Sequence, residues 1–150
     1  MKKYIVFILS SIFVSLVQAQ QPVTWDDLAK VRWITGYDQD RNVYYDIPQP
    51  SQEIKNLNNK EITIQGFYVP VDSFGEYFAL SLGPSSMCFF CNVGGLETVM
   101  EIRVKKGHRG LRRVEMDRYI ELKGRFVLNV DSNDHLMYIL EDAELISIIK

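Results

Sequence analysis

The sequence predicts an all-β protein: a small five-stranded OB-like Greek-key barrel with a short N-terminal helix. Three observations support this prediction. Five apolar, strand-like runs follow one another between residues 60 and 149. Two of these runs contain an interior glycine, Gly66 or Gly124, and strands of small barrels bend at such positions. One long break separates the third run from the fourth, as in the Greek-key connection of OB folds.

Length and composition agree with one packed domain. The chain has 150 residues, of which 47% are hydrophobic and 24% charged, proportions that are typical of a globular core rather than of disorder. We divide the chain into a signal peptide at residues 1–19, an N-terminal helix and extended strap at 20–59, and an OB-like barrel at 60–150.

The first residues have the features of a secretory signal. Lys2 and Lys3 precede an apolar run from Tyr4 to Val17, and Ala19 ends a sequence that a signal peptidase accepts. The run is shorter than the roughly 20 residues that span a bilayer. We therefore expect cleavage after Ala19 and an exported protein, periplasmic or extracellular, that does not span the membrane once the signal is removed.

The charge of the mature chain argues against nucleic acid as a partner. Removing the two lysines of the signal leaves 15 of the 17 basic residues against 19 acidic ones, a net charge of about −4. Nucleic-acid affinity depends largely on neutralising phosphates with Lys and Arg. We expect no nucleic-acid partner.

The segment from Thr24 to Val31 is predicted to be a short helix. Thr24 is a favourable N-cap, and the two aspartates in the first turn complement the helix dipole. Trp25 and Leu28 share one face at three-residue spacing. Because so short a helix is unstable alone, we expect both side chains to be buried against the barrel.

Residues 36–59 are predicted to form an extended strap. Prolines near its end bias the residues before them away from helix. The strap contains Tyr37, Tyr44 and Tyr45. We expect these rings to pack against the barrel; stacking on a ligand is the alternative.

The strands of the barrel are predicted from alternating apolar and polar residues bounded by turns. Residues 105–113 form the one basic run, which we interpret as a solvated loop between the third and fourth strands; a patch for phosphate or anionic lipid is the alternative. The five strands are expected at Ile62–Val71, Tyr77–Leu82, Leu96–Val104, Tyr119–Val130 and Leu136–Ile149.

The chemistry of the chain is predicted to lie at Cys88 and Cys91, the only two cysteines, spaced as Cys-x-x-Cys. Thiols this close can form a structural disulfide, exchange it, or bind one metal ion. An oxidising compartment favours pairing, although so short a loop gains little stability from it. The three alternatives stay open. In each we expect the Cα atoms within about 7 Å, at the rim of the barrel.

A metal at this pair would need further ligands. Zinc favours four, and the chain offers only His108 and His135 as imidazoles. Cu(I) accepts soft sulfur and low coordination, so Met87, beside the pair, is a further candidate. The candidate metal ligands are Cys88 and Cys91, with Met87 and His135 as weaker candidates.

The residues between and after the cysteines are candidates for binding a partner. Phe89 and Phe90 cannot both be buried inside a four-residue turn, and an exposed phenylalanine offers apolar area for docking. Asn92 completes the candidate partner-binding set. The sequence contains neither a Ser-His-Asp order nor a phosphate loop, and its carboxylate pairs are explained by the helix start and a turn. An enzyme is therefore not supported.

The order and spacing of several motifs resemble a family of uncharacterised exported OB-like proteins, across most of residues 24 to 149. The resemblance implies an exported barrel without an established enzymatic activity, often encoded near ABC-type transport or metal-acquisition genes. The matching residues are Trp25 and Leu28 as Trp-x-x-Leu, Gly66 to Pro70 as Gly-Phe-x-Val-Pro, Phe78 to Leu82, Leu122 to Phe126 with its interior glycine, and Tyr138 to Leu140.

The cysteine segment departs from the pattern of that family, whose loop runs Cys-x-His followed by prolines and an Asn. Cys88 matches the family cysteine, and Asn92 is the counterpart of the Asn. Phe90 stands where the histidine would be, the prolines are absent, and Cys91 is additional. The expected function is that of an exported binding or accessory protein that handles a metal or serves a membrane transport complex. A thiol–disulfide oxidoreductase and a purely structural accessory domain are the alternatives.

Overall fold

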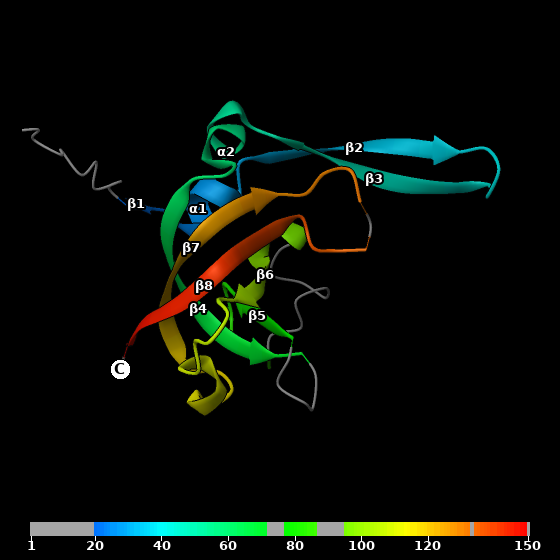
Figure 1. Cartoon of the computed structure of the whole chain (residues 1–150). Helices are drawn as coiled ribbons and strands as arrows, with labels where there is room; N and C mark the ends of the chain where they lie inside the picture. The colour runs from blue at the N-terminus through cyan, green and yellow to red at the C-terminus, as the bar shows by residue number, and fades with distance from the viewer. Residues whose placement is uncertain (1–19, 72–76, 87–94, 133, 150) are drawn as a thin grey trace, which may run out of the picture.

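A computed structural model of the chain describes residues 20–71, 77–86, 95–132 and 134–149. Figure 1 shows a barrel from which one long hairpin projects. In chain order the elements are β1 (Gln21–Pro22), α1 (Trp25–Leu28), β2 (Val31–Asp38), β3 (Val43–Pro50), α2 (Gln52–Leu57), β4 (Glu61–Pro70), β5 (Phe78–Ser81), the 3-10 turn η1 (Leu96–Thr98), β6 (Val99–Val104), the 3-10 turn η2 (Leu111–Arg113), β7 (Tyr119–Leu128) and β8 (Tyr138–Ile148).

The predicted barrel is confirmed. Strands β4, β5, β6, β8 and β7 are neighbours in that order, and β7 pairs back onto β4 to close the ring; β1 adds a short parallel pairing to β4. The sequence also led us to expect five antiparallel strands, and this expectation was wrong, because β6 and β8 run parallel. An odd number of strands in a closed ring cannot alternate direction at every step, so at least one pair must be parallel.

The core fills the barrel because alternate residues along each strand point inward. On β4 the buried residues Ile62, Ile64 and Tyr68 alternate with more exposed neighbours. The largest fully buried side chains include Phe126 and Tyr138, whose rings pack with centroids 5.6 Å apart. The barrel interior is therefore a packed core rather than a cavity for a ligand.

The glycines inside strands lie at close backbone approaches, as predicted for bends. At Gly124 an added Cβ would lie 2.7 Å from the carbonyl oxygen of Glu141. Lys123 and Arg125 face Glu144 and Glu141 across the ladder, so two residues of β8 face Gly124 alone. One of these two, Asp142, has a φ of 51°. This bulge bends the sheet where the barrel closes.

The N-terminal helix is confirmed but is shorter than expected. It covers Trp25 to Leu28, and Val31 already begins β2. Thr24 caps the helix and exchanges hydrogen bonds with Asp27 in a capping box. Trp25 and Leu28 are buried, as predicted. The indole N–H of Trp25 donates to the Gln65 carbonyl at 2.8 Å and ties the helix to β4.

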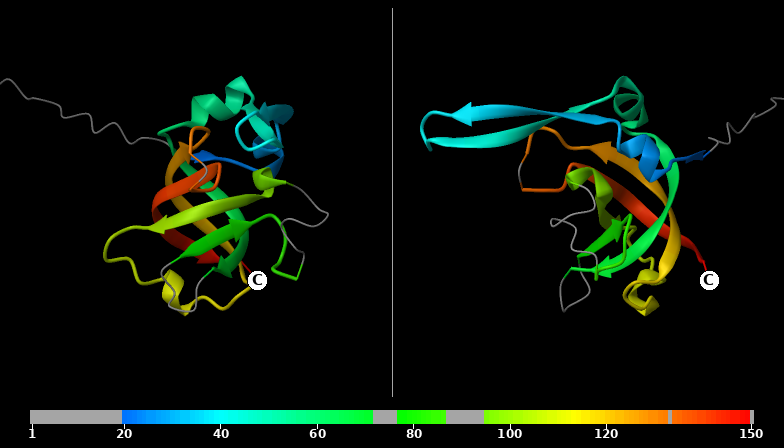
Figure 2. Two further views of the ribbon diagram at one scale, coloured as in Figure 1. Left: turned by 90° about the vertical axis from the view of Figure 1, so that its right-hand side faces the viewer. Right: turned by 180° about the vertical axis from the view of Figure 1, so that it is seen from behind.

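The expected strap is a two-stranded hairpin, the hairpin arm (residues 31–50), which projects away from the barrel (Figure 2). The prediction that its tyrosines pack against the barrel was wrong: Tyr37, Tyr44 and Tyr45 are 46%, 76% and 50% exposed. The two strands satisfy each other's backbone hydrogen bonds, and the Tyr37 and Tyr44 rings pack together at 4.9 Å. The base of the arm, with Trp33, packs against the core.

Two further features complete the fold. Helix α2 was not predicted; Ser51 caps it, and it buries Ile54 and Leu57. No helix in the described part of the chain has the length and apolarity that crossing a bilayer requires.

Candidate functional site

The cysteine segment is the candidate site that the sequence predicts. Its residues, Met87, Cys88, Phe89, Phe90, Cys91 and Asn92, lie outside the described residues. The pairing of the cysteines, their position at the rim and their ligands therefore stay predictions. The described residues on either side define how the segment is attached to the barrel.

The N-terminal attachment of the segment is a clamp between Ser85 and Asp117. The backbone N–H of Ser85 donates to Oδ1 of Asp117 at 2.6 Å, and the Ser85 hydroxyl donates to Oδ2 at 2.7 Å. Asp117 is itself held by a bond from its N–H to the Tyr68 carbonyl at 2.9 Å, with a φ of 63°. Both carboxylate oxygens are thus committed to one residue, two positions before the segment begins.

The C-terminal attachment is made by Glu97 of η1. Its Oε1 accepts the N–H of Gly95 at 3.1 Å. Its Oε2 is buried and has no hydrogen-bond partner among the described residues. A buried carboxylate oxygen without a partner is costly. Glu97 lies close in sequence to the cysteine segment, so its Oε2 is available to accept a hydrogen bond or to bind a metal ion there.

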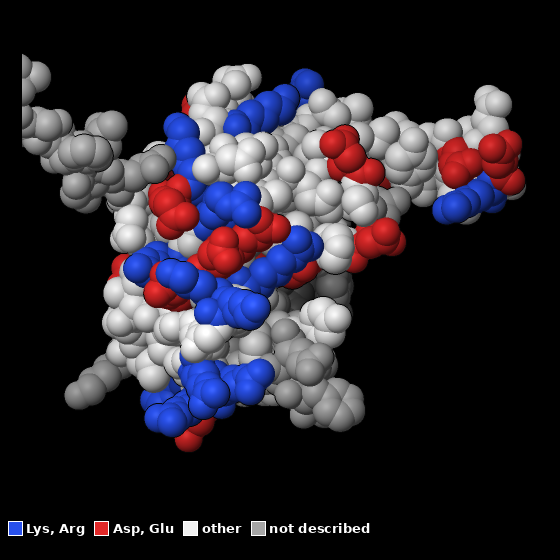
Figure 3. All heavy atoms as spheres, viewed as in Figure 1, with Lys and Arg blue, Asp and Glu red and all other residues white. Residues whose placement is uncertain are grey.

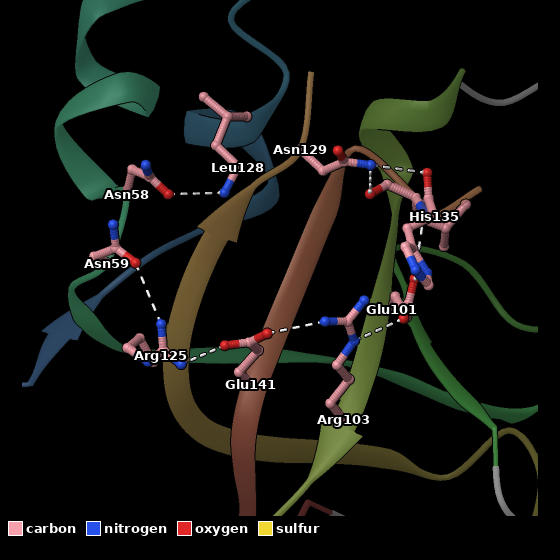
Figure 4. A network of polar contacts seen from close by, with 10 residues as sticks. Asn58, Asn59, Glu101, Arg103, Arg125, Leu128, Asn129, His135 and Glu141 are labelled. Carbon is pink, nitrogen blue, oxygen red and sulfur yellow. Dashed lines mark hydrogen bonds and ion pairs between the residues drawn. The ribbon is translucent and has the colours of Figure 1, made fainter. Parts of the chain in front are cut away.

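His135 lies in the connection between β7 and β8, and the structure brings it to Glu101 of β6. Its Nδ1 is 3.2 Å from Oε2 of Glu101, which leaves Nε2 for another partner. Asn129 shapes this connection, because its side-chain amide donates to the carbonyls of Ser132, His135 and Leu136. Figure 4 shows Asn129 beside His135. A histidine oriented by a carboxylate on one nitrogen is the usual arrangement of a metal ligand.

A row of ion pairs crosses the outer face of β6, β8 and β7 (Figure 4). Arg103 contacts Glu101 at 3.0 Å and Glu141 at 2.9 Å, and Arg125 pairs with the other oxygen of Glu141. Burial disfavours the charge of Arg103, but the bonds from Glu101 and Glu141 outweigh it and raise the Arg103 pKa. Figure 3 shows acidic and basic side chains intermixed over this face. The row is internally neutralised and offers no free anion site.

The basic run is a largely exposed loop, as predicted. Lys105 pairs with Glu144 at 2.8 Å, and Leu111 anchors the loop in the core. His108 accepts the backbone N–H of Leu145 on Nε2 at 3.1 Å. This bond gives His108 a structural role.

Sequence reasoning missed Asp117, Glu97 and Glu101. Asp117 is 32 residues from Ser85, and Glu101 is 34 from His135, so no local pattern connects them. Within residues 20–71, 77–86, 95–132 and 134–149, no group of three or more His, Cys, Asp and Glu side chains forms a metal cluster.

Comparison with known proteins supports the fold but provides no information on function. No protein-family profile matches the sequence, and no curated protein matches it. The crystal structure of a DUF3299 family protein from Pseudomonas aeruginosa PAO1 is similar, with a TM-score of 0.54 and 15% sequence identity. The similarity covers 88% of this chain and 99% of that one. At this identity the two share a fold, which agrees with the resemblance to a family of unknown function.

Proposed function

We propose that this chain is an exported binding or accessory protein, and that its Cys88–Cys91 segment binds a metal ion on behalf of a membrane transport complex. The observation that supports this most is the orphan Oε2 of Glu97, a buried acceptor at the end of the cysteine segment. A divalent metal held by the two thiolates would give that buried oxygen a ligand bond in place of the missing hydrogen bond.

Zinc fits the available donors better than Cu(I). Zinc accepts thiolate, carboxylate and imidazole together. Glu97, close in sequence to the cysteine segment, supplies a carboxylate, and His135, whose ring contacts Glu101, supplies an imidazole. Cu(I) would use sulfur alone, from Cys88, Cys91 and Met87. Zinc is therefore the proposed ion and copper is the alternative. Identifying the metal bound to the isolated protein distinguishes the two.

The hairpin arm supports a role in binding a partner protein. Ile34, Val43 and Tyr45 lie on one face of the arm at 42%, 47% and 50% exposure. An isolated two-stranded sheet is marginally stable in water, so covering this face would stabilise the arm. Phe89, Phe90 and Asn92 are the proposed contacts on the cysteine segment.

The metal proposal is tested on protein isolated from the compartment to which it is exported. We expect one zinc ion per chain and two thiols that become reactive when the metal is chelated. Cys88→Ser should abolish zinc binding, and Glu97→Gln should weaken it about tenfold or more, because it removes the charge and keeps the shape. Glu115→Gln changes the net charge equally on an exposed residue and should leave zinc affinity unchanged.

Other results of these measurements would support the two alternative functions of the cysteine pair. A metal-free disulfide that oxidises a dithiol substrate would establish the thiol–disulfide oxidoreductase. A disulfide that neither binds metal nor exchanges would leave the structural accessory domain. We propose that residues 1–19 are removed on export, so N-terminal sequencing of the isolated protein should begin at Gln20; an intact Met1 would contradict export by this signal.

A further inference from the structure

A pocket of about 250 Å³ lies outside the barrel, between the N-terminal segment and the outer face of β4 and β7. Residues 22–25, from the end of β1 to the start of α1, form one wall. Thr63 and Gln65 of β4 and Tyr119 and Glu121 of β7 form the floor. The pocket uses none of the residues of the cysteine segment, and its proposed role is independent of the function proposed above.

The pocket walls are mainly apolar and rigidly held. Pro22 and Val23 line it beside Trp25, whose indole N–H is already occupied by the Gln65 carbonyl. Tyr119 packs edge-on against Phe67, with ring centroids 5.0 Å apart. Trp and Tyr rings attract cations over their faces, and these contacts hold both rings at the pocket.

The charged group of the pocket is Glu121. Among the described residues its two oxygens accept neutral donors, the Gln65 amide at 3.4 Å and the Ser147 hydroxyl at 3.2 Å. In the described part of the chain no Lys, Arg or His nitrogen lies within 4.0 Å of it. The outward carboxylates Glu141 and Glu144 on β8 each pair with a basic side chain. Within the part of the chain that the structure describes, Glu121 is thus a carboxylate without an ion-pair partner beside an apolar, aromatic hollow.

We propose that this pocket binds a small organic ammonium compound, with its cationic nitrogen at Glu121 and its apolar part against Trp25, Tyr119 and Pro22. Opposite charge at the carboxylate and the aromatic rings both favour a cation, and the walls favour a hydrocarbon part. Since a liquid water occupies about 30 Å³, the pocket holds a ligand of about eight to ten non-hydrogen atoms.

The test uses the indole N–H resonances of the two tryptophans. Trp25 lines the pocket and Trp33 lies on β2, so Trp33 serves as an internal reference, assigned with Trp33→Phe. Titration with 2-phenylethylammonium should shift the Trp25 resonance saturably and leave that of Trp33 in place. The isosteric neutral probe, 2-phenylethanol, should bind at least about tenfold more weakly.

Variants decide whether Glu121 is responsible. Glu121→Gln keeps an acceptor for Ser147 and should weaken binding of the ammonium probe about tenfold or more. Glu53→Gln, an exposed residue on α2, is the charge-matched control and should bind as the wild type does. Unchanged affinity in Glu121→Gln, equal affinity for the neutral probe, or no shift of Trp25 in the wild type would each overturn the proposal.

A second measurement on the wild type covers the case in which Glu121→Gln fails to fold. Raising the ionic strength from about 0.01 to 1 M should weaken the ammonium probe several-fold and leave 2-phenylethanol unaffected, because salt screens a partly exposed charge pair. Salt-independent binding of the ammonium probe would also overturn the proposal. Neither result depends on the state of Cys88 and Cys91, so failure here leaves the metal proposal untouched.

Discussion

Replacing Trp25 with Ala is expected to destabilise the protein by about 3 kcal/mol. Large aromatic-to-alanine changes in cores cost about 3–5 kcal/mol, and Trp25 is only 8% exposed. The cost depends on whether the space left behind can relax or fill. Trp25 borders the 250 Å³ pocket, so water can enter the enlarged space, and we place the loss at the lower end of the range.

The Trp25→Phe variant separates packing from hydrogen bonding. It keeps an aromatic ring in the core but removes the N–H that donates to Gln65 at 2.8 Å. A net contribution of about 1 kcal/mol is typical of one hydrogen bond, and an unsatisfied buried carbonyl costs somewhat more. We therefore expect Trp25→Phe to lose about 1–2 kcal/mol, between the wild type and Trp25→Ala.

The assay is urea unfolding followed by far-UV circular dichroism, because the substitution removes a fluorophore. All variants are compared in one redox state, so that Cys88 and Cys91 contribute equally, and a constant m-value would show that the unfolded ensemble is unchanged. Ile34→Ala, on the exposed face of the hairpin arm, is the control and should cost below about 1 kcal/mol. A Trp25→Ala midpoint equal to that of the wild type would refute the proposed burial.

Two other substitutions test the core. Tyr138→Phe should cost about 1–3 kcal/mol at pH 7, because the Tyr138 hydroxyl donates to the buried Leu28 carbonyl at 2.7 Å. Burial also raises the Tyr138 pKa above 10.0, so the unfolded chain loses this proton first. Wild-type stability should therefore fall as the pH rises past 10, and it should fall less steeply in Tyr138→Phe. Urea unfolding of both proteins at pH 7 and above pH 10 checks this. An equal loss of stability in the two proteins would contradict it. Gly124→Ala places a Cβ 2.7 Å from the Glu141 carbonyl and 2.9 Å from Leu140. This substitution should destabilise the protein by about 1–3 kcal/mol and lower the melting temperature. An unchanged melting curve would contradict this and would mean that the β8 backbone moves to accommodate the added Cβ.

Local patterns predicted most of the secondary structure. The cap at Thr24, the burial of Trp25 and Leu28, and the five strands of the barrel all depend on residues a few positions apart. The interior glycine Gly124 is part of the same local signal. Caps and alternation act between near neighbours in sequence, so a single sequence contains the information needed to recognise them.

The site was predicted less completely. The cysteine pair is evident from its spacing, but the residues that attach its segment are not. Asp117 reaches Ser85 across 32 residues, and the accepting oxygen at Glu97 is notable only because folding buries it. Before folding, neither carboxylate differs from any other on the chain.

What the sequence by itself determined was the five strands of the barrel and their order, the cap of the N-terminal helix, and the cysteine pair. The tertiary structure alone decided that β8 lies between β6 and β7, which makes one pairing parallel. It also decided that the hairpin arm projects away from the barrel and that Glu121 borders an apolar pocket. These features depend on contacts between segments far apart in the chain. Such contacts form because closure of the barrel buries apolar surface. The amount of surface buried depends on all segments of the chain together, so no local pattern predicts it.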